Sequence, residues 1–289
     1  MKKTLCFNLY ILILAYAAYS QSSIKWNVDT IHSKVLNEER FIWIKLPAGI
    51  DLSNKIRKYR VAFILDAEAL FYTSNEVVEK INKEKNTGII DWIFIGIDNI
   101  WLRDRDYTTS YVKPSVHVDS NAAAVSGGAV HFTKFLEKEL LPFINSKYPV
   151  STERIFIGHS LGGLFTINIL FNHPGLFSHY VAIDPSMWWD DMKLLKDIQR
   201  QGVSSLSKKS LFLAVANTKE KNMTENQIRS DNSNKTILTR PGLRLHDFMK
   251  TNNNVEFKYN YKFYKDREHM SVYPDALYDA IRFVSGQTH

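Results

Sequence analysis

Cysteine is nearly absent from this chain of 289 residues, and its one cysteine is Cys6. Cys6 lies in an N-terminal segment that we expect to be removed. Without Cys6 the protein has no cysteine, and disulfides, cysteine nucleophiles and metal sites built on cysteine are excluded. Closely spaced sets of histidines and carboxylates are lacking as well. We therefore predict no metal site in this protein.

Charge is not concentrated in any stretch of the sequence. The net charge is +7, and without Lys2 and Lys3 it falls to +5, from 35 basic and 30 acidic residues. Such a mild surplus favours an anionic substrate or an anionic surface, but the lack of a dense basic stripe argues against a nucleic-acid partner. Repeats and low-complexity tracts are also missing. With 45% apolar residues the chain is rich enough to bury a large core.

The apolar run near the N-terminus is too short to span a membrane. Residues 5–18 are apolar apart from one asparagine, whereas a spanning helix needs about 18 apolar residues. The basic pair Lys2-Lys3 precedes the run, and Ala18-Tyr19-Ser20 places small residues where a signal peptidase reads the chain. We therefore predict a signal peptide at 1–20 and export to a bacterial periplasm or the medium, with no stable membrane anchor after cleavage. An uncleaved anchor is the alternative.

The remaining residues, 21–289, alternate between strand-like apolar runs and segments of helical periodicity. Strands are predicted at 41–46, 60–65, 92–97, 155–157, 180–183, 211–216 and 257–264. Helices are predicted at 68–85, 128–148, 163–170, 236–250 and 274–284, and 21–40 is typical of an edge strand or a lead-in. This order predicts βαβ units, and hence a mostly parallel central sheet with helices on both faces. We expect one α/β domain, with the less regular segment 187–201 compatible with a small cap over the site.

A serine between two glycines stands at the centre of this pattern. Residues 158–162 read Gly-His-Ser-Leu-Gly, between the strand 155–157 and an apolar helix. A serine at such a strand-to-helix turn is typical of a nucleophile elbow, in which strain exposes the hydroxyl at the N-terminus of a helix. We expect side chains at Gly158 and Gly162 to collide with the neighbouring helix and strand. The sequence therefore predicts Ser160 as a nucleophile.

A serine hydroxyl needs a base, and His269 is the histidine best placed to serve. In an elbow hydrolase the base follows the nucleophile and lies after the last strand, with the acid between them in chain order. His269 stands directly after the strand 257–264 and before the last helix. The other histidines are less suitable. Those at 32, 117 and 131 precede the elbow, and His159 lies within it with its side chain directed away from Ser160. Those at 173 and 179 follow the elbow too closely, 246 falls in a helical stretch and 289 ends the chain.

The acid that orients the base is less well determined by the sequence. We expect it in the loop after the strand 211–216, where three carboxylates qualify: Glu220, Glu225 and Asp231. Any of them could hold the imidazole in the required tautomer and stabilise its positive form. We favour Asp231.

Two backbone donors are expected to stabilise the tetrahedral oxyanion. The amide of Leu161, the residue after the nucleophile, supplies one of them. The second normally comes from the loop after an earlier strand, and we assign it to Ala67.

Several of these segments resemble the bacterial putative esterase family of α/β hydrolases, which includes esterase D and the enterochelin esterases. The resemblance rests on GHSLGGLF at 158–165, SGG at 126–128 and AIDPSMWW at 182–189, with further matches at 65–66, 103–107 and 268–269. It covers roughly 35–283 and implies an α/β-hydrolase fold and a Ser–His–acid esterase without a cofactor. It also implies that Arg103 lies close to the substrate carbonyl, although Arg103 and Arg105 are equally compatible with structural ion pairs.

The chain departs from the family pattern at three positions. Ala67 stands where the family usually has glycine, which would narrow the oxyanion loop. Asp184 stands where serine is frequent, and Met270 follows the histidine where glycine is common. None of these departures removes a catalytic group, but they leave substrate preference open and are compatible with a weakened enzyme.

Three functions remain compatible with the sequence. The first is a serine carboxylic-ester hydrolase on a small-molecule ester of siderophore, feruloyl or acetyl-sugar type, with Trp188 beside a bulky or aromatic acyl group. The second is an acyltransferase on the same residues, which differs only in the acceptor. The third is a binding protein on a hydrolase fold that has lost turnover. The sequence leaves the oligomeric state undetermined.

Overall fold

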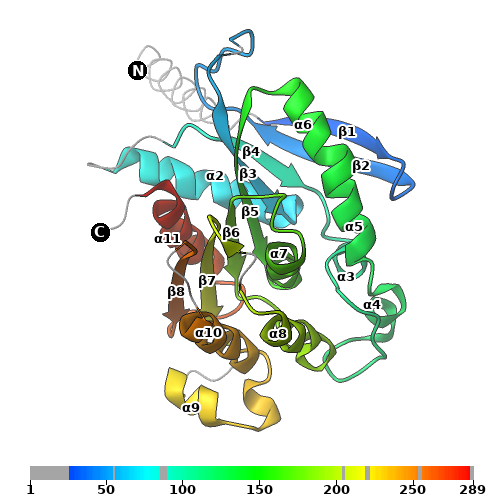
Figure 1. Ribbon diagram of the computed structural model, residues 1–289, viewed down its shortest axis with the longest axis vertical. Coiled ribbons are helices and arrows are strands. Elements are labelled where there is room, and N and C mark those ends of the chain that lie inside the picture. Colours follow the sequence, from blue (N-terminus) through cyan, green and yellow to red (C-terminus); the bar gives the residue numbers. More distant parts are fainter. Residues whose placement is uncertain are drawn as a thin grey trace, which may run out of the picture.

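In the computed structural model, the strands form one sheet of eight members with helices on both faces (Figure 1). The structure describes residues 26–54, 56–84, 90–203, 206–218, 222–252 and 256–286. The order across the sheet is β1-β2-β4-β3-β5-β6-β7-β8, and only the pairs β1–β2 and β2–β4 are antiparallel. The strands are β1 Asn27–Ser33, β2 Glu38–Lys45, β3 Tyr59–Leu65, β4 Ile93–Ile97, β5 Val150–His159, β6 His179–Ile183, β7 Ser210–Ala216 and β8 Lys258–Tyr264.

Two layers of helices cover the sheet. One face carries α2 (Ala67–Lys83) and α11 (Tyr273–Ser285), whose apolar side chains share a core cluster with the strands. The other face carries α5 (Ala129–Phe135), α6 (Leu141–Lys147), α7 (Leu161–Asn172), α8 (Trp189–Gln201) and α10 (Arg240–Asn252). The predicted α/β-hydrolase architecture is therefore confirmed.

The predicted strands and helices coincide with observed elements to within a few residues, with informative exceptions. The lead-in contains the edge strand β1. The helix predicted over 128–148 is interrupted between α5 and α6 by a π-helical turn, Leu136–Leu140. Three short helices were not predicted, because four to six residues are too few to show helical periodicity: α3 Arg103–Asp106, α4 Ser120–Val125 and α9 Glu225–Ser230. The predicted signal peptide lies outside the described residues, and none of the described helices has the length and apolarity needed to span a bilayer.

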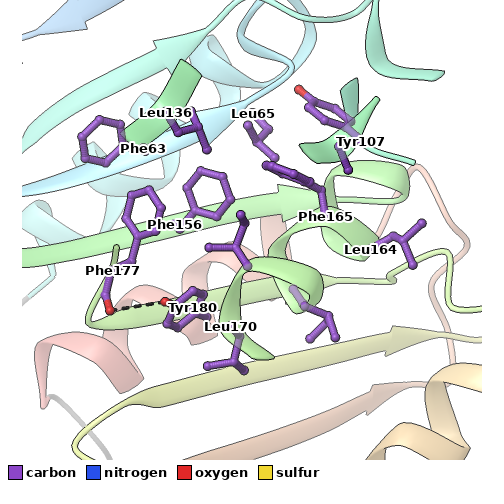
Figure 2. Close-up of a cluster of buried hydrophobic side chains, with 14 of the residues drawn as sticks. Phe63, Leu65, Tyr107, Leu136, Phe156, Leu164, Phe165, Leu170, Phe177 and Tyr180 are labelled. Atoms are coloured by element: carbon purple, nitrogen blue, oxygen red, sulfur yellow. Dashed lines mark hydrogen bonds between the residues drawn. The ribbon is translucent and has the colours of Figure 1, made fainter. Parts of the chain in front are cut away.

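Aromatic packing fixes the strand that leads to the elbow. Phe156 of β5 stacks on Phe177 with ring centroids 4.3 Å apart, and its other neighbour is Phe165 of α7 at 6.0 Å (Figure 2). Tyr180 closes the cluster by donating its hydroxyl to the carbonyl oxygen of Phe177 at 3.3 Å. Each fully buried phenylalanine stabilises the fold by about 1.5–3 kcal/mol. This cluster holds β5 and α7 in place on both sides of the turn between them.

Candidate active site

The turn between β5 and α7 has the strained geometry of a nucleophile elbow. Ser160 adopts φ 62° and ψ −122°, a conformation that residues with a Cβ rarely take. A Cβ at Gly158 would lie 2.1 Å from the carbonyl oxygen of Gly162, so only glycine fits there. The predicted collision at Gly162 is wrong, since its nearest neighbour would be 3.4 Å away. Gly163 is the tighter position, 2.9 Å from Cα of Pro185.

His269 is paired with a carboxylate directly after β6. Its Nδ1–H donates to Oδ2 of Asp184 at 2.6 Å. Asp184 is 7% exposed, and its other oxygen accepts the backbone N–H of Ala216 at 2.9 Å. The hydroxyl of Thr218 adds a contact of 3.3 Å to Oδ2. Because a carboxylate only accepts, this arrangement places the imidazole proton on Nδ1 and leaves Nε2 as the basic nitrogen.

The structure contradicts the prediction that Asp231 is the partner of His269. The Asp231 carboxylate accepts from the hydroxyls of Ser233 at 2.7 Å and Thr236 at 2.8 Å, within its own loop. Glu225, the second candidate, accepts from Arg229 and from the hydroxyl of Tyr261. The third candidate, Glu220, lies outside the described residues.

The prediction failed because it placed the acid after β7, whereas the observed acid follows β6. The residue that directly follows β7 is Asn217, whose backbone N–H donates to the carbonyls of Tyr264 and Arg267. Asp184 follows β6, and the carboxyl ends of parallel strands meet at one edge of the sheet. A carboxylate immediately after a buried strand is the sequence signal that points to Asp184, which in the sequence stands out only as a departure from the family pattern.

The two predicted oxyanion donors both stand at the first position of a helix. Leu161 begins α7 and Ala67 begins α2, and the N–H of a first helical residue has no partner inside its own helix. Asp66, directly before Ala67, has φ 54° and turns the chain into α2. The Ala67 methyl is buried in the core between α2 and the sheet, where a Cβ at Gly96 would be only 2.7 Å from it. The alanine is thus accommodated beside Gly96, on the side of α2 that faces the sheet.

Arg103 lies between the Asp66 loop and the elbow. Its Nη2 donates to Oδ2 of Asp66 at 3.2 Å and to the carbonyl oxygen of His159 at 3.4 Å. Burial raises the pKa of the Asp66 carboxyl to about 6, and the charge of Arg103 opposes this rise. Arg103 remains 24% exposed, so one side of it still faces solvent. Arg105, in contrast, is paired with Glu38 at 2.7 Å and Asp106 at 2.8 Å in a structural ion-pair network.

The two adjacent tryptophans have different environments. Trp189 is buried and donates its indole N–H to the carbonyl of Ser110 at 3.2 Å. Trp188 is only partly buried, and its ring lies 5.9 Å from that of His117, which is exposed. Trp188 follows Ser186 by two residues, and the Ser186 hydroxyl is 3.4 Å from that of Ser160. The partly buried ring of Trp188 therefore belongs to a segment that passes directly beside Ser160.

The candidate catalytic groups lie together at one edge of the sheet. Ser160, the His269–Asp184 pair, the starts of α2 and α7 and the Arg103 guanidinium all meet at the carboxyl edge of the sheet. Among the described residues, no group of three His, Cys, Asp or Glu side chains is placed to hold a metal ion. The arrangement therefore provides a hydroxyl on a strained backbone turn, an imidazole oriented by a carboxylate, and backbone N–H donors at two helix N-termini.

Known proteins are similar to this chain over most of its length. A family model described as putative esterase matches residues 33–277. Ferri-bacillibactin esterase BesA of Bacillus subtilis (strain 168) is 34% identical over 148 residues, 48% of this chain and about half (51%) of that relative. The siderophore enterobactin esterase of Emericella nidulans is 28% identical over 251 residues, 77% of this chain and 81% of that one. The crystal structure of an IroE-like serine hydrolase from Shewanella oneidensis matches with a TM-score of 0.77 and 28% identity, covering 89% of this chain and 79% of that one.

Proposed function

Because the chain belongs to the putative esterase family, we propose that it is a serine carboxylic-ester hydrolase in which Ser160 carries the acyl group. The observation that carries this proposal is the 2.6 Å contact between His269 Nδ1 and Asp184 at the same edge of the sheet as the strained Ser160. A carboxylate that fixes the tautomer of a histidine is the arrangement that activates a serine.

The reaction follows from the roles of these groups. Oγ of Ser160 attacks the ester carbonyl carbon while Nε2 of His269 takes the hydroxyl proton. Collapse of the tetrahedral intermediate breaks the bond to the leaving alkoxide, which receives that proton from His269. Water then attacks the acyl enzyme, with His269 again as base, and releases the acid and free Ser160. Asp184 stays ionised and stabilises the imidazolium in both steps.

The developing oxyanion is stabilised by the amides of Leu161 and Ala67. Both donate from the N-terminus of a helix, where the peptide dipoles favour negative charge. Arg103 adds a positive charge beside this pocket, since its guanidinium contacts both the loop before Ala67 and the carbonyl of the residue before Ser160. Loss of one oxyanion donor typically costs about 10²–10³ in rate.

We propose a siderophore ester as the substrate class. The support comes from the relatives, which include a ferri-bacillibactin esterase and a siderophore enterobactin esterase. The partly buried ring of Trp188, two residues after Ser186, and the exposed ring of His117 lie 5.9 Å apart and provide an aromatic surface on which an aromatic acyl group could stack. The Arg103 charge suits a substrate that carries negative charge.

A panel of esters with the Ser160→Ala variant as control tests this proposal. Enterobactin with and without Fe(III), triacetylfusarinine C, ethyl ferulate and an acetylated xylose are incubated with residues 21–289, and the products are separated by chromatography. We expect the siderophore esters to be cleaved fastest and the variant to be inactive. Faster cleavage of ferulate or acetyl-sugar would refute the substrate class. Transfer of the acyl group to an added alcohol in preference to water would make the protein an acyltransferase.

We also propose that the protein is exported, on the basis of the basic pair, the apolar run and the small residues within 1–20. The expected N-terminus of the protein recovered from a bacterial periplasm is Gln21. Recovery of the full-length chain from the cytoplasm of the same cells would contradict export.

A further inference from the structure

His159, the histidine inside the nucleophile elbow, packs against His269, the predicted base. His159 is the last residue of β5 and is 4% exposed. Its ring lies 4.5 Å from that of His269 and 5.9 Å, edge to face, from that of Tyr273 in the first turn of α11. Tyr273 is itself held through its hydroxyl, 2.8 Å from that of Ser74 in α2. His159 therefore joins the elbow to the loop that carries His269.

The contact between the two histidines is a directed hydrogen bond. Nε2 of His159 lies 2.7 Å from the backbone carbonyl oxygen of His269. Because a carbonyl only accepts, the proton must be on Nε2 of His159. Burial, followed by the charge of His269, lowers the pKa of His159 to about 4, so the ring is neutral near pH 7 and keeps its proton on this nitrogen.

The loop around His269 has other anchors, but among the described residues they lie on either side of the main chain of His269. The ring of His269 is about a third exposed, and Met270 next to it is 71% exposed. The backbone of the loop is held at Arg267, whose carbonyl accepts from Asn217, and at Val272, whose N–H donates to Glu268. Among the described residues, His159 supplies the one side-chain hydrogen bond to the main chain of His269 itself.

We propose that His159 is a positioning residue that fixes the backbone of His269, so that Asp184 and Ser160 are both within reach of one imidazole. This inference rests on the proposed esterase function. Asp184 fixes the rotation of the His269 ring through its contact with Nδ1. His159 fixes the position of the His269 backbone through its hydrogen bond to the carbonyl oxygen. A misplacement of about 1 Å of a catalytic group can cost roughly 10²-fold in rate. His159 touches neither the substrate nor the reacting atoms, so its effect should appear in kcat and not in KM.

Two substitutions separate the hydrogen bond from the volume of the side chain. His159→Gln keeps an N–H donor near the position of Nε2, whereas His159→Leu removes it, and His159→Met serves if the leucine variant does not fold. The matched control is His179→Leu, because His179 is partly buried and its ring is also hydrogen-bonded, to Ser210 at 2.7 Å, but it begins β6, at the end of the strand opposite to Asp184. Thermal melts verify that each variant is folded.

Two readouts test the inference. With p-nitrophenyl butyrate, we expect kcat of His159→Leu to fall by roughly 10²-fold with KM unchanged, His159→Gln to retain most of the activity, and His179→Leu to match the wild type. Deuterium exchange should rise over 265–272 in His159→Leu alone. Equal loss of kcat in the glutamine and leucine variants, or unchanged exchange over 265–272, would overturn the inference. A wild-type protein that is inactive on every ester would instead refute the proposed function, while the exchange experiment would still decide the role of His159.

Discussion

Neutralising Asp184 is the perturbation that follows most directly from the site. Asp184→Asn keeps the size of the side chain and its contact with the N–H of Ala216, but removes the charge 2.6 Å from Nδ1 of His269. The asparagine amide can also present an N–H to Nδ1, which would favour the tautomer with the proton on Nε2. Such a ring cannot accept the proton of Ser160.

The size of the effect can be estimated from the geometry. With the charges of the imidazolium and the carboxylate about 4 Å apart and an effective dielectric constant of about 20, their attraction is about 4 kcal/mol. At about 1.4 kcal/mol per factor of ten, this corresponds to about 10³ in kcat. The wrong tautomer adds to it, and the loss of the charged acid in Ser–His–Asp triads costs about 10⁴. We expect kcat to fall by about 10³–10⁴ and KM to change little.

The assay is p-nitrophenyl butyrate hydrolysis under saturating substrate, with Asp231→Asn as the matched control. Asp231 lies in an exposed loop and contacts Ser233 and Thr236, so its substitution should leave kcat unchanged. A loss of less than tenfold in Asp184→Asn, or a large loss in Asp231→Asn, would refute the reasoning about the acid.

Three further substitutions test the structure around the site. Gly158→Ala should destabilise the fold by about 3 kcal/mol or more in urea titrations, while Gly175→Ala, with open space at its Cβ, should not. Burial raises the pKa of Asp66 to about 6, so the contribution of this carboxyl to stability, measured as the difference from Asp66→Asn, should fall as pH rises from about 3.8 to 6. Burial lowers the pKa of His179 to about 4, so the contribution of this imidazole to stability, measured as the difference from His179→Gln, should fall as pH decreases from about 6.5 to 4. A contribution of Asp66 or of His179 that changes with pH in the opposite direction would contradict the burial assigned to that residue.

The sequence was sufficient for the fold because its central strands are buried on both faces. Runs such as 60–65 and 211–216 consist almost entirely of apolar residues, and each is a strand in the sheet. Elements that depend on tertiary contacts were missed. The short helix α3 is a single turn held by ion pairs through Arg105, whereas the polar edge strand β1, defined by its pairing with β2, was expected only as an edge strand or a lead-in.

The candidate site was predictable where local sequence determines geometry. The steric need for glycine at 158 and the position of His269 after β8 both follow from the order of elements along the chain. The acid was less well determined, because β6 and β7 end at the same edge of the sheet and the order of elements does not decide which of the two following loops presents its carboxylate to His269. Only the packing of the strands places Asp184, and not Asp231, beside the imidazole.

Trapping the acyl enzyme tests the central claim most directly. The protein is mixed with p-nitrophenyl acetate, quenched in acid within the first turnovers and digested, and the peptides are examined by mass spectrometry. We predict an acetyl group on Ser160 that is absent from Ser160→Ala and accumulates far more slowly in His269→Ala. Release of p-nitrophenol with no acetyl group on Ser160, or with the group on another residue, would contradict the account.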